Sequence, residues 1–158
     1  MIKSARSWPL EGSLIQGEID MAISTRDDAS HPRLRLRTAP TVWLCAADFK
    51  FMRHEPIPLV LHDEPSLFRS IALQALESAR LPLRLNHISG SLSGIRAAVR
   101  AGLGITARSI ETLEPDFRVV GTVEGLPPLP DVSFYLYIAS LSAHPTARRL
   151  FESLKDSF

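Results

Sequence analysis

The stretch Ser91-Leu-Ser-Gly-Ile-Arg-Ala-Ala-Val-Arg-Ala-Gly-Leu-Gly-Ile105 decides the fold of this chain. Ser91 is a natural N-cap, and Gly102 stands where a glycine commonly ends a helix. The segment Leu103-Gly-Ile-Thr-Ala107 follows without a linker and predicts a buried strand. Apolar residues recur between the cap and this strand at helical spacing, opposite two arginines. The apolar set is Leu92, Ile95, Val99 and Leu103, and the arginines are Arg96 and Arg100.

Strands and helices alternate along the rest of the chain. This alternation indicates βαβ units, an α/β fold and a mainly parallel sheet. Ser66 and Pro145 stand where two further helices are expected to begin. The expected strands are 19–24, 33–38, 42–47, 57–61, 83–88, 104–107, 117–120 and 132–139, and the expected helices are 67–79, 91–101 and the segment from 145 onward.

Composition limits the classes of function. With 158 residues, 45% of them hydrophobic, the chain can bury one core or two smaller ones. Its net charge of +1 gives no basic nucleic-acid surface. Arg33, Arg35 and Arg37 alternate with leucines, as on the solvent face of a strand.

Nothing in the sequence indicates export or a membrane. No stretch approaches the roughly twenty apolar residues of a membrane span, and the first residues lack the apolar core of a secretory signal. Cys45 is the one cysteine, so an internal disulfide is ruled out. We therefore expect a cytoplasmic protein.

Three motifs of catalytic or metal chemistry are absent on closer reading. The glycines of Gly102-Leu-Gly-Ile-Thr-Ala107 fit a dinucleotide pattern, but they close a helix and open a strand, the reverse of what that pattern needs. Gly90-Ser-Leu-Ser-Gly94 has Leu92 where a nucleophile elbow needs serine. The five histidines have no metal-ligand spacing. We expect no catalytic residue, no metal and no cofactor.

Two strand-to-helix turns remain as ligand candidates, at 62–66 and 88–91. The amides in the first turn of each helix have no intrahelical partner, and the helix dipole suits a carboxylate there. The alternative is that Ser66 and Ser91 only cap their helices, which accounts for each serine alone.

The segment Gly17-Glu-Ile-Asp-Met-Ala-Ile23, taken with Val99-Arg-Ala-Gly-Leu-Gly-Ile105, resembles the effector-binding domain of LysR-type transcriptional regulators. The match extends from about Gly17 to Phe158. It is closest to the LrhA/HexA-like branch, on the strings Pro40-Thr-Val-Trp43, Pro58-Leu-Val-Leu61 and Gly125-Leu-Pro-Pro-Leu-Pro130.

The resemblance implies two Rossmann-like lobes joined by two crossings, as in periplasmic binding proteins of type 2. Lobe I would be 1–41 with 122–158, and lobe II would be 42–121. Lobe I would be incomplete at its N-terminus, without the family's first strand and helix. The winged helix-turn-helix is expected to be absent as well, so that DNA is contacted only through that absent domain.

The function implied is a non-enzymatic sensor that binds a small effector, such as a small organic acid, between the lobes. The chain would form a homodimer or tetramer. The family's polar effector contacts map to Ser66, Phe68, Arg69, Ser89, Ser91, Thr41 and Trp43, and Arg108 could supply charge, although a solvated arginine is the alternative. A solute-binding protein of the same fold is the second hypothesis, opposed by the missing signal peptide. An enzyme is the third, opposed by the missing nucleophile and base.

Overall fold

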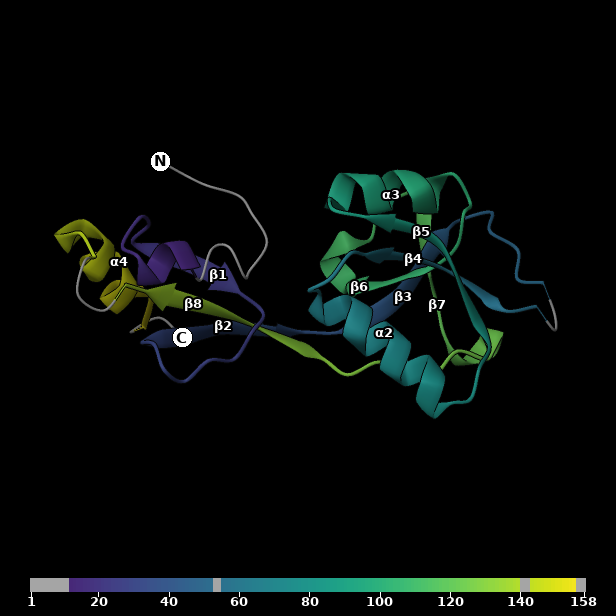
Figure 1. Ribbon diagram of the computed structural model, residues 1–158, viewed down its shortest axis with the longest axis horizontal. Coiled ribbons are helices and arrows are strands. Elements are labelled where there is room, and N and C mark those ends of the chain that lie inside the picture. The colour runs from purple at the N-terminus through teal and green to yellow at the C-terminus, as the bar shows by residue number, and fades with distance from the viewer. Residues whose placement is uncertain (1–11, 53–54, 140–142, 156–158) are drawn as a thin grey trace. The chain divides into compact units, whose positions relative to one another are not determined.

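The computed structural model describes residues 12–52, 55–139 and 143–155 (Figure 1). These residues divide into two compact units. Unit 1 consists of the described residues up to Ala39 together with those from Val132 onward, and unit 2 runs from Pro40 to Asp131.

Unit 1 is built on an antiparallel sheet of three strands in the order β1-β8-β2. Its core contains Leu14, Leu136, Tyr137 and Phe151. On β2, Arg35 and Arg37 are exposed, which confirms the predicted solvent face. The elements are β1 (Met21–Ser24), β2 (Arg33–Ala39), β8 (Val132–Ile138) and α4 (Pro145–Lys155).

A helical stretch at residues 12–15 precedes β1 in unit 1. The predicted absence of the family's first helix stays a prediction, because the residues before Gly12 lie outside the described ones. The predicted absence of the first strand falls on residues that lie outside the described ones.

The described residues of unit 2 form a three-stranded sheet and a two-stranded sheet. One is antiparallel, in the order β6-β3-β7, and the other is the parallel pair β4-β5. Leu59 also bridges Ile105 in parallel. The elements are β3 (Thr41–Ala46), β4 (Ile57–His62), α2 (Leu67–Ser78), β5 (Leu83–Ser89), α3 (Leu92–Arg100), β6 (Thr106–Ser109), η1 (Ile110–Thr112), β7 (Phe117–Val120) and η2 (Thr122–Glu124).

Helices α2 and α3 cover opposite faces of β4 (Figure 1). Successive side chains of a strand point to opposite faces. Leu59 and Leu61 therefore pack in one cluster with Leu76 of α2, while Val60 packs with Val99 of α3. Leu59, Val60 and Leu61 are each at most 1% exposed, so β4 lies at the centre of unit 2.

The prediction of a mainly parallel sheet is wrong for most described pairings. It is confirmed for β4 and β5, which are joined by the helix α2. β3 pairs antiparallel with β6 and β7, and β8 pairs antiparallel with β1 and β2. The alternation of strands with helices predicts direction only for strands on either side of a helix. β3 follows β2 with only Pro40 between them.

The predicted helix-to-strand corner is confirmed. The Ser91 hydroxyl accepts a hydrogen bond from Gly94 N at 3.1 Å, and Gly102 has φ +73 just past the end of α3. The backbone of Gly104 runs so close to β4 that an added Cβ would lie 2.4 Å from the carbonyl oxygen of Pro58. Leu103, however, is 43% exposed and does not join the apolar face of α3.

The second boundary between the units lies at Val132, and the predicted boundary at 122 falls inside unit 2. The reason is packing. Leu126 is 2% exposed and belongs to the main core cluster of unit 2. The indole nitrogen of Trp43 donates to the carbonyl oxygen of Pro127 at 2.8 Å. These two contacts keep the Pro-rich turn with unit 2.

Candidate functional site

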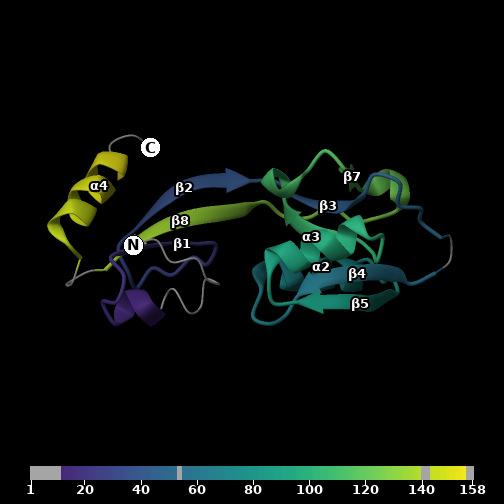
Figure 2. The same cartoon turned by 90° about the horizontal axis from the view of Figure 1, so that it is seen from above.

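The two predicted strand-to-helix turns meet at one edge of unit 2. β4 and β5 lie side by side in parallel, with His62 paired to Ser89 (Figure 2). His62 Nδ1 lies 3.0 Å from the Ser89 carbonyl oxygen, which can only accept, so Nδ1 carries the proton. Asp63 N donates to the same oxygen at 3.2 Å. His62 thus ties the two turns together, a role that our sequence analysis did not assign to it.

The first turn is held by Ser66 and Arg69. The Ser66 hydroxyl caps α2 by accepting from Arg69 N at 3.4 Å. The Arg69 side chain folds back, and its Nη1 donates to the His62 carbonyl oxygen at 3.1 Å. Its Nε lies 3.4 Å from a Glu64 carboxylate oxygen. Because Arg69 already faces an acidic side chain, its main effect is to fix the shape of this turn.

The second turn places a group of hydroxyls at the N-terminus of α3. Ser89 Oγ accepts from Ser91 N at 3.2 Å, and Ser91 Oγ lies 3.2 Å from Ser93 Oγ. Ser91 is exposed and Ser89 is half-buried. Hydroxyls both donate and accept, so this group can meet an incoming polar ligand while it caps the helix.

We predict that Gly94→Ala disturbs this hydroxyl group. A Cβ at this position would lie 2.2 Å from Ser89 Oγ and 3.1 Å from Ser89 Cβ, so the serine must move. Alanine otherwise favours a helix over glycine by about 1 kcal/mol, which offsets part of the strain. We expect the melting temperature to change little while ligand-induced stabilisation falls. Gly121→Ala, whose added Cβ would meet nothing within 4 Å, is the control. An unchanged ligand response in Gly94→Ala would contradict the role given to Ser89.

Arg108 on β6 supplies a shielded positive charge. Its guanidinium carbon lies 4.6 Å from the ring centroid of Phe68, in the first turn of α2. Burial, and then repulsion from Arg96, lowers the pKa of Arg108 to about 10. Arg96 is itself paired, with its Nε 2.8 Å from Glu114. Among the described residues no acidic group forms an ion pair with Arg108, and its Nε has no hydrogen-bond partner.

Arg108 is half-buried. A cation that is shielded from water and has no counter-charge is costly in a folded protein, and an anionic ligand would relieve that cost. Thr41 is a second unsatisfied group: it is 6% exposed, and its Oγ1 has no hydrogen-bond partner. It pairs on β3 with Ser109, the residue after Arg108. Buried polar atoms usually have a hydrogen-bond partner, so the lack of one at Arg108 Nε and at Thr41 Oγ1 needs an explanation.

Trp43 is not brought to these residues. It is 2% exposed in the main core cluster of unit 2, with its indole N–H already donated to Pro127. We therefore correct its assignment from effector contact to core residue. The other predicted residues lie in three places. The two linked turns contain Ser66, Arg69, Ser89 and Ser91. Arg108 lies over the ring of Phe68, and Thr41 lies on β3 opposite Ser109.

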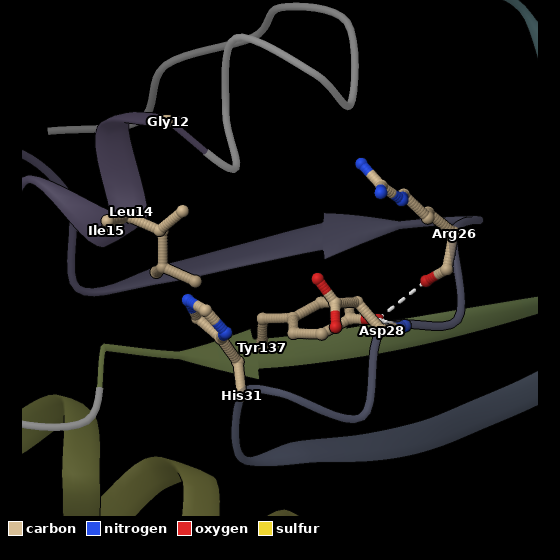
Figure 3. A pocket seen from close by; sticks show the side chains of 7 residues that line it. All are labelled: Gly12, Leu14, Ile15, Arg26, Asp28, His31 and Tyr137. Carbon is tan, nitrogen blue, oxygen red and sulfur yellow. Dashed lines mark hydrogen bonds between the residues drawn. The ribbon is translucent and has the colours of Figure 1, made fainter.

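A cavity of about 310 Å³ lies within unit 1, which the sequence did not point to (Figure 3). It contains none of the predicted site residues. Its walls come from the helical stretch before β1, from the loop between β1 and β2, and from β8. The lining residues are Gly12, Leu14, Ile15, Arg26, Asp28, His31 and Tyr137.

Within the described ranges, no group of three or more His, Cys, Asp or Glu side chains could hold a metal ion. In the same part of the chain, no helix has the length and apolar character needed to cross a membrane.

This chain is similar to a known protein family and to known transcriptional regulators. The family model named LysR substrate binding domain matches residues 4–158. The HTH-type transcriptional regulator PecT of Dickeya dadantii (strain 3937) is 47% identical over 131 residues, which are 83% of this chain and 42% of PecT. The chain thus spans less than half the length of that relative.

Two solved structures share the fold. The bromide-bound regulatory domain of HypT from Salmonella typhimurium has a TM-score of 0.78 at 16% identity, over 99% of this chain and 80% of that one. The regulatory domain of CcmR from Synechocystis PCC6803, in complex with 2-PG, has a TM-score of 0.73 at 14% identity, over 99% of this chain and 82% of that one.

Proposed function

Since this chain belongs to the LysR family and is the effector-binding regulatory domain of a transcriptional regulator, we propose that it senses a small anionic effector bound near Arg108. The domain is regulatory and not enzymatic. In the whole protein, DNA would be contacted by a segment outside this chain, and effector binding would alter that contact.

The observation that supports this proposal most is the half-buried charge of Arg108, which has no ion-pair partner among the described residues. An arginine in this state binds a carboxylate or phosphate more strongly than an exposed one, because water competes less. The hydroxyls of Ser89 and Ser91 and the backbone amides of the α3 N-terminus would donate hydrogen bonds to the remaining oxygens of the ligand. We propose that the pocket also includes Ser66, Phe68, Arg69 and Thr41.

We propose further that units 1 and 2 are lobes I and II of a fold like that of type 2 periplasmic binding proteins, with lobe II running from Pro40 to Asp131. The Pro-rich strings support a place in the LrhA/HexA-like branch. A homodimer or tetramer is proposed because apolar side chains remain exposed on β5, where Leu85 is 42% and Ile88 is 47% exposed. A cytoplasmic location is proposed because the family consists of regulators of transcription.

The test of the effector site is Ser91→Ala. Loss of the cap alone lowers stability by roughly 1 kcal/mol, so the melting temperature of the free protein decides nothing. A thermal-shift screen of small carboxylates and phosphorylated acids, including the 2-PG of the CcmR complex, first finds an anion that stabilises the parent. We expect Ser91→Ala to lose most of that ligand-induced shift. Ser78→Ala, at the exposed end of α2, should keep it. Equal shifts in all three proteins would reduce Ser91 to a helix cap.

A further inference from the structure

The cavity in unit 1 has the shape of a second ligand site, separate from the residues proposed above. Its volume of about 310 Å³ is at the lower end of the roughly 300–1,000 Å³ typical of small-molecule pockets. All its lining residues belong to unit 1. A ligand bound in this cavity would therefore be small and would contact residues of unit 1.

The wall formed by the loop between β1 and β2 is held in place before any ligand binds. Tyr137, which is 2% exposed, donates its hydroxyl to the Arg26 carbonyl oxygen at 2.6 Å and accepts from Asp28 N at 2.8 Å. Burial raises the pKa of Tyr137, so its hydroxyl stays protonated. Asp28 Oδ1 accepts from Ser30 N at 2.9 Å and from Ser30 Oγ at 2.7 Å. A pocket with fixed walls loses less entropy when it binds.

One side of the cavity is apolar. Leu14 and Ile15 line it from the helical stretch, and Ile15 is 67% exposed, a large fraction for so apolar a side chain. An aliphatic or aromatic side chain could be buried here against the Tyr137 ring.

The other side carries charges of both signs. Figure 3 shows the Asp28 side chain between Arg26 and His31. Hydrogen bonds from Ser30, with the charges of Arg26 and His31, hold the pKa of Asp28 below its usual value, so the carboxylate is ionised. A simple acid would be repelled by the Asp28 carboxylate, and a simple amine by the Arg26 guanidinium. A molecule that carries both an ammonium and a carboxylate could form an ion pair with each sign of charge in the cavity.

We propose that this cavity binds a free amino acid with an apolar side chain. Its ammonium would pair with Asp28, its carboxylate with Arg26 or His31, and its side chain would pack on Leu14 and Ile15. The regulator would then read a second, zwitterionic signal besides the anion at the Arg108 site.

The test is a titration of the chain with leucine followed by two-dimensional amide NMR and calorimetry. We expect shift changes at the cavity residues of unit 1. Removing the carboxylate (3-methylbutylamine), the ammonium (4-methylpentanoate) or the side chain (glycine) should each weaken binding by about tenfold or more, the loss of one good contact. Equal binding of either singly charged analogue, shifts confined to unit 2, or no binding of leucine or phenylalanine at millimolar concentration would each overturn the proposal.

Variants locate the site independently. Asp28→Asn and Ile15→Ala should each weaken leucine binding; the second change sits at an exposed position and should leave the fold intact. Asp131→Asn, an exposed acidic residue of unit 2, should bind leucine as the parent does. Arg108→Met should also retain leucine binding while losing the anionic effector, so the failure of either site is seen separately. Parent-like binding in both unit 1 variants would refute the assignment of this cavity.

Discussion

Replacement of Gly104 by alanine is expected to lower the free energy of unfolding by about 3–5 kcal/mol, from overpacking plus lost hydrogen bonds. The new Cβ would lie 2.4 Å from the oxygen, and 2.8 Å from the carbon, of the Pro58 carbonyl. Both atoms are backbone of the buried strand β4, so no rotamer change can make room. Ile105 N bonds Pro58 O, and Val60 N bonds Ile105 O, each at 2.9 Å. Moving the chain away from β4 would break both bonds.

Gly102→Ala is the matched control, two residues away in the same corner. Gly102 has φ +73, but an added Cβ would meet nothing within 4 Å. Gly102→Ala should therefore lower the free energy of unfolding only by the cost of a left-handed backbone at an alanine, roughly 1–2 kcal/mol. Urea denaturation of the parent and both variants measures the difference. Equal losses in the two variants would mean that the contact with Pro58 is not what demands glycine at position 104.

The local features of the fold could be predicted because short-range chemistry determines them. Ser66 and Ser91 cap their helices as expected, and Gly102 ends α3. Each depends on a few neighbouring residues. The pairing of β3 with β6 and β7 depends instead on contacts between residues more than sixty positions apart. No local pattern near β3 records the direction of those partners.

The candidate site shows the same division. The two serine turns were visible as strand-to-helix junctions, whereas the burial of Arg108 against Phe68 joins β6 to α2 and follows only from packing. Trp43 lay next to the expected crossing in the sequence, but alternation along β3 turns it into the core. The unit 1 cavity brings the helical stretch before β1 to β8, over a hundred residues later, and has no signature in either segment.

Arg108→Met is expected to change stability and ligand binding in opposite directions. In the free protein Arg108 is shielded from water, repelled by Arg96 and without a hydrogen bond at Nε. Replacing such a half-buried charge, which lacks a counter-charge, by an apolar side chain of similar length should raise the free energy of unfolding by about 1–3 kcal/mol. Methionine can keep the contact with the Phe68 ring. The anionic effector, which we place against the guanidinium, should bind at least about 100-fold more weakly, because a charge-assisted hydrogen bond is lost.

The pH dependence of the stability gain follows from the pKa of about 10 for Arg108, which burial lowers from the ordinary value of an arginine. At neutral pH the guanidinium is protonated in both the folded and the unfolded state. The folded protein is then destabilised by the full cost of shielding this charge from water, so the stability gain from methionine should not vary with pH in this range. Above about pH 10 the folded state releases the proton first, so the parent becomes relatively more stable and the advantage of methionine shrinks. Arg37→Met is the control: Arg37 lies over Phe134 at 5.0 Å but is exposed, so its removal should bring no gain. If Arg108→Met destabilises the free protein, or still shows the full effector-induced shift in melting temperature, Arg108 is a structural residue and the effector binds elsewhere.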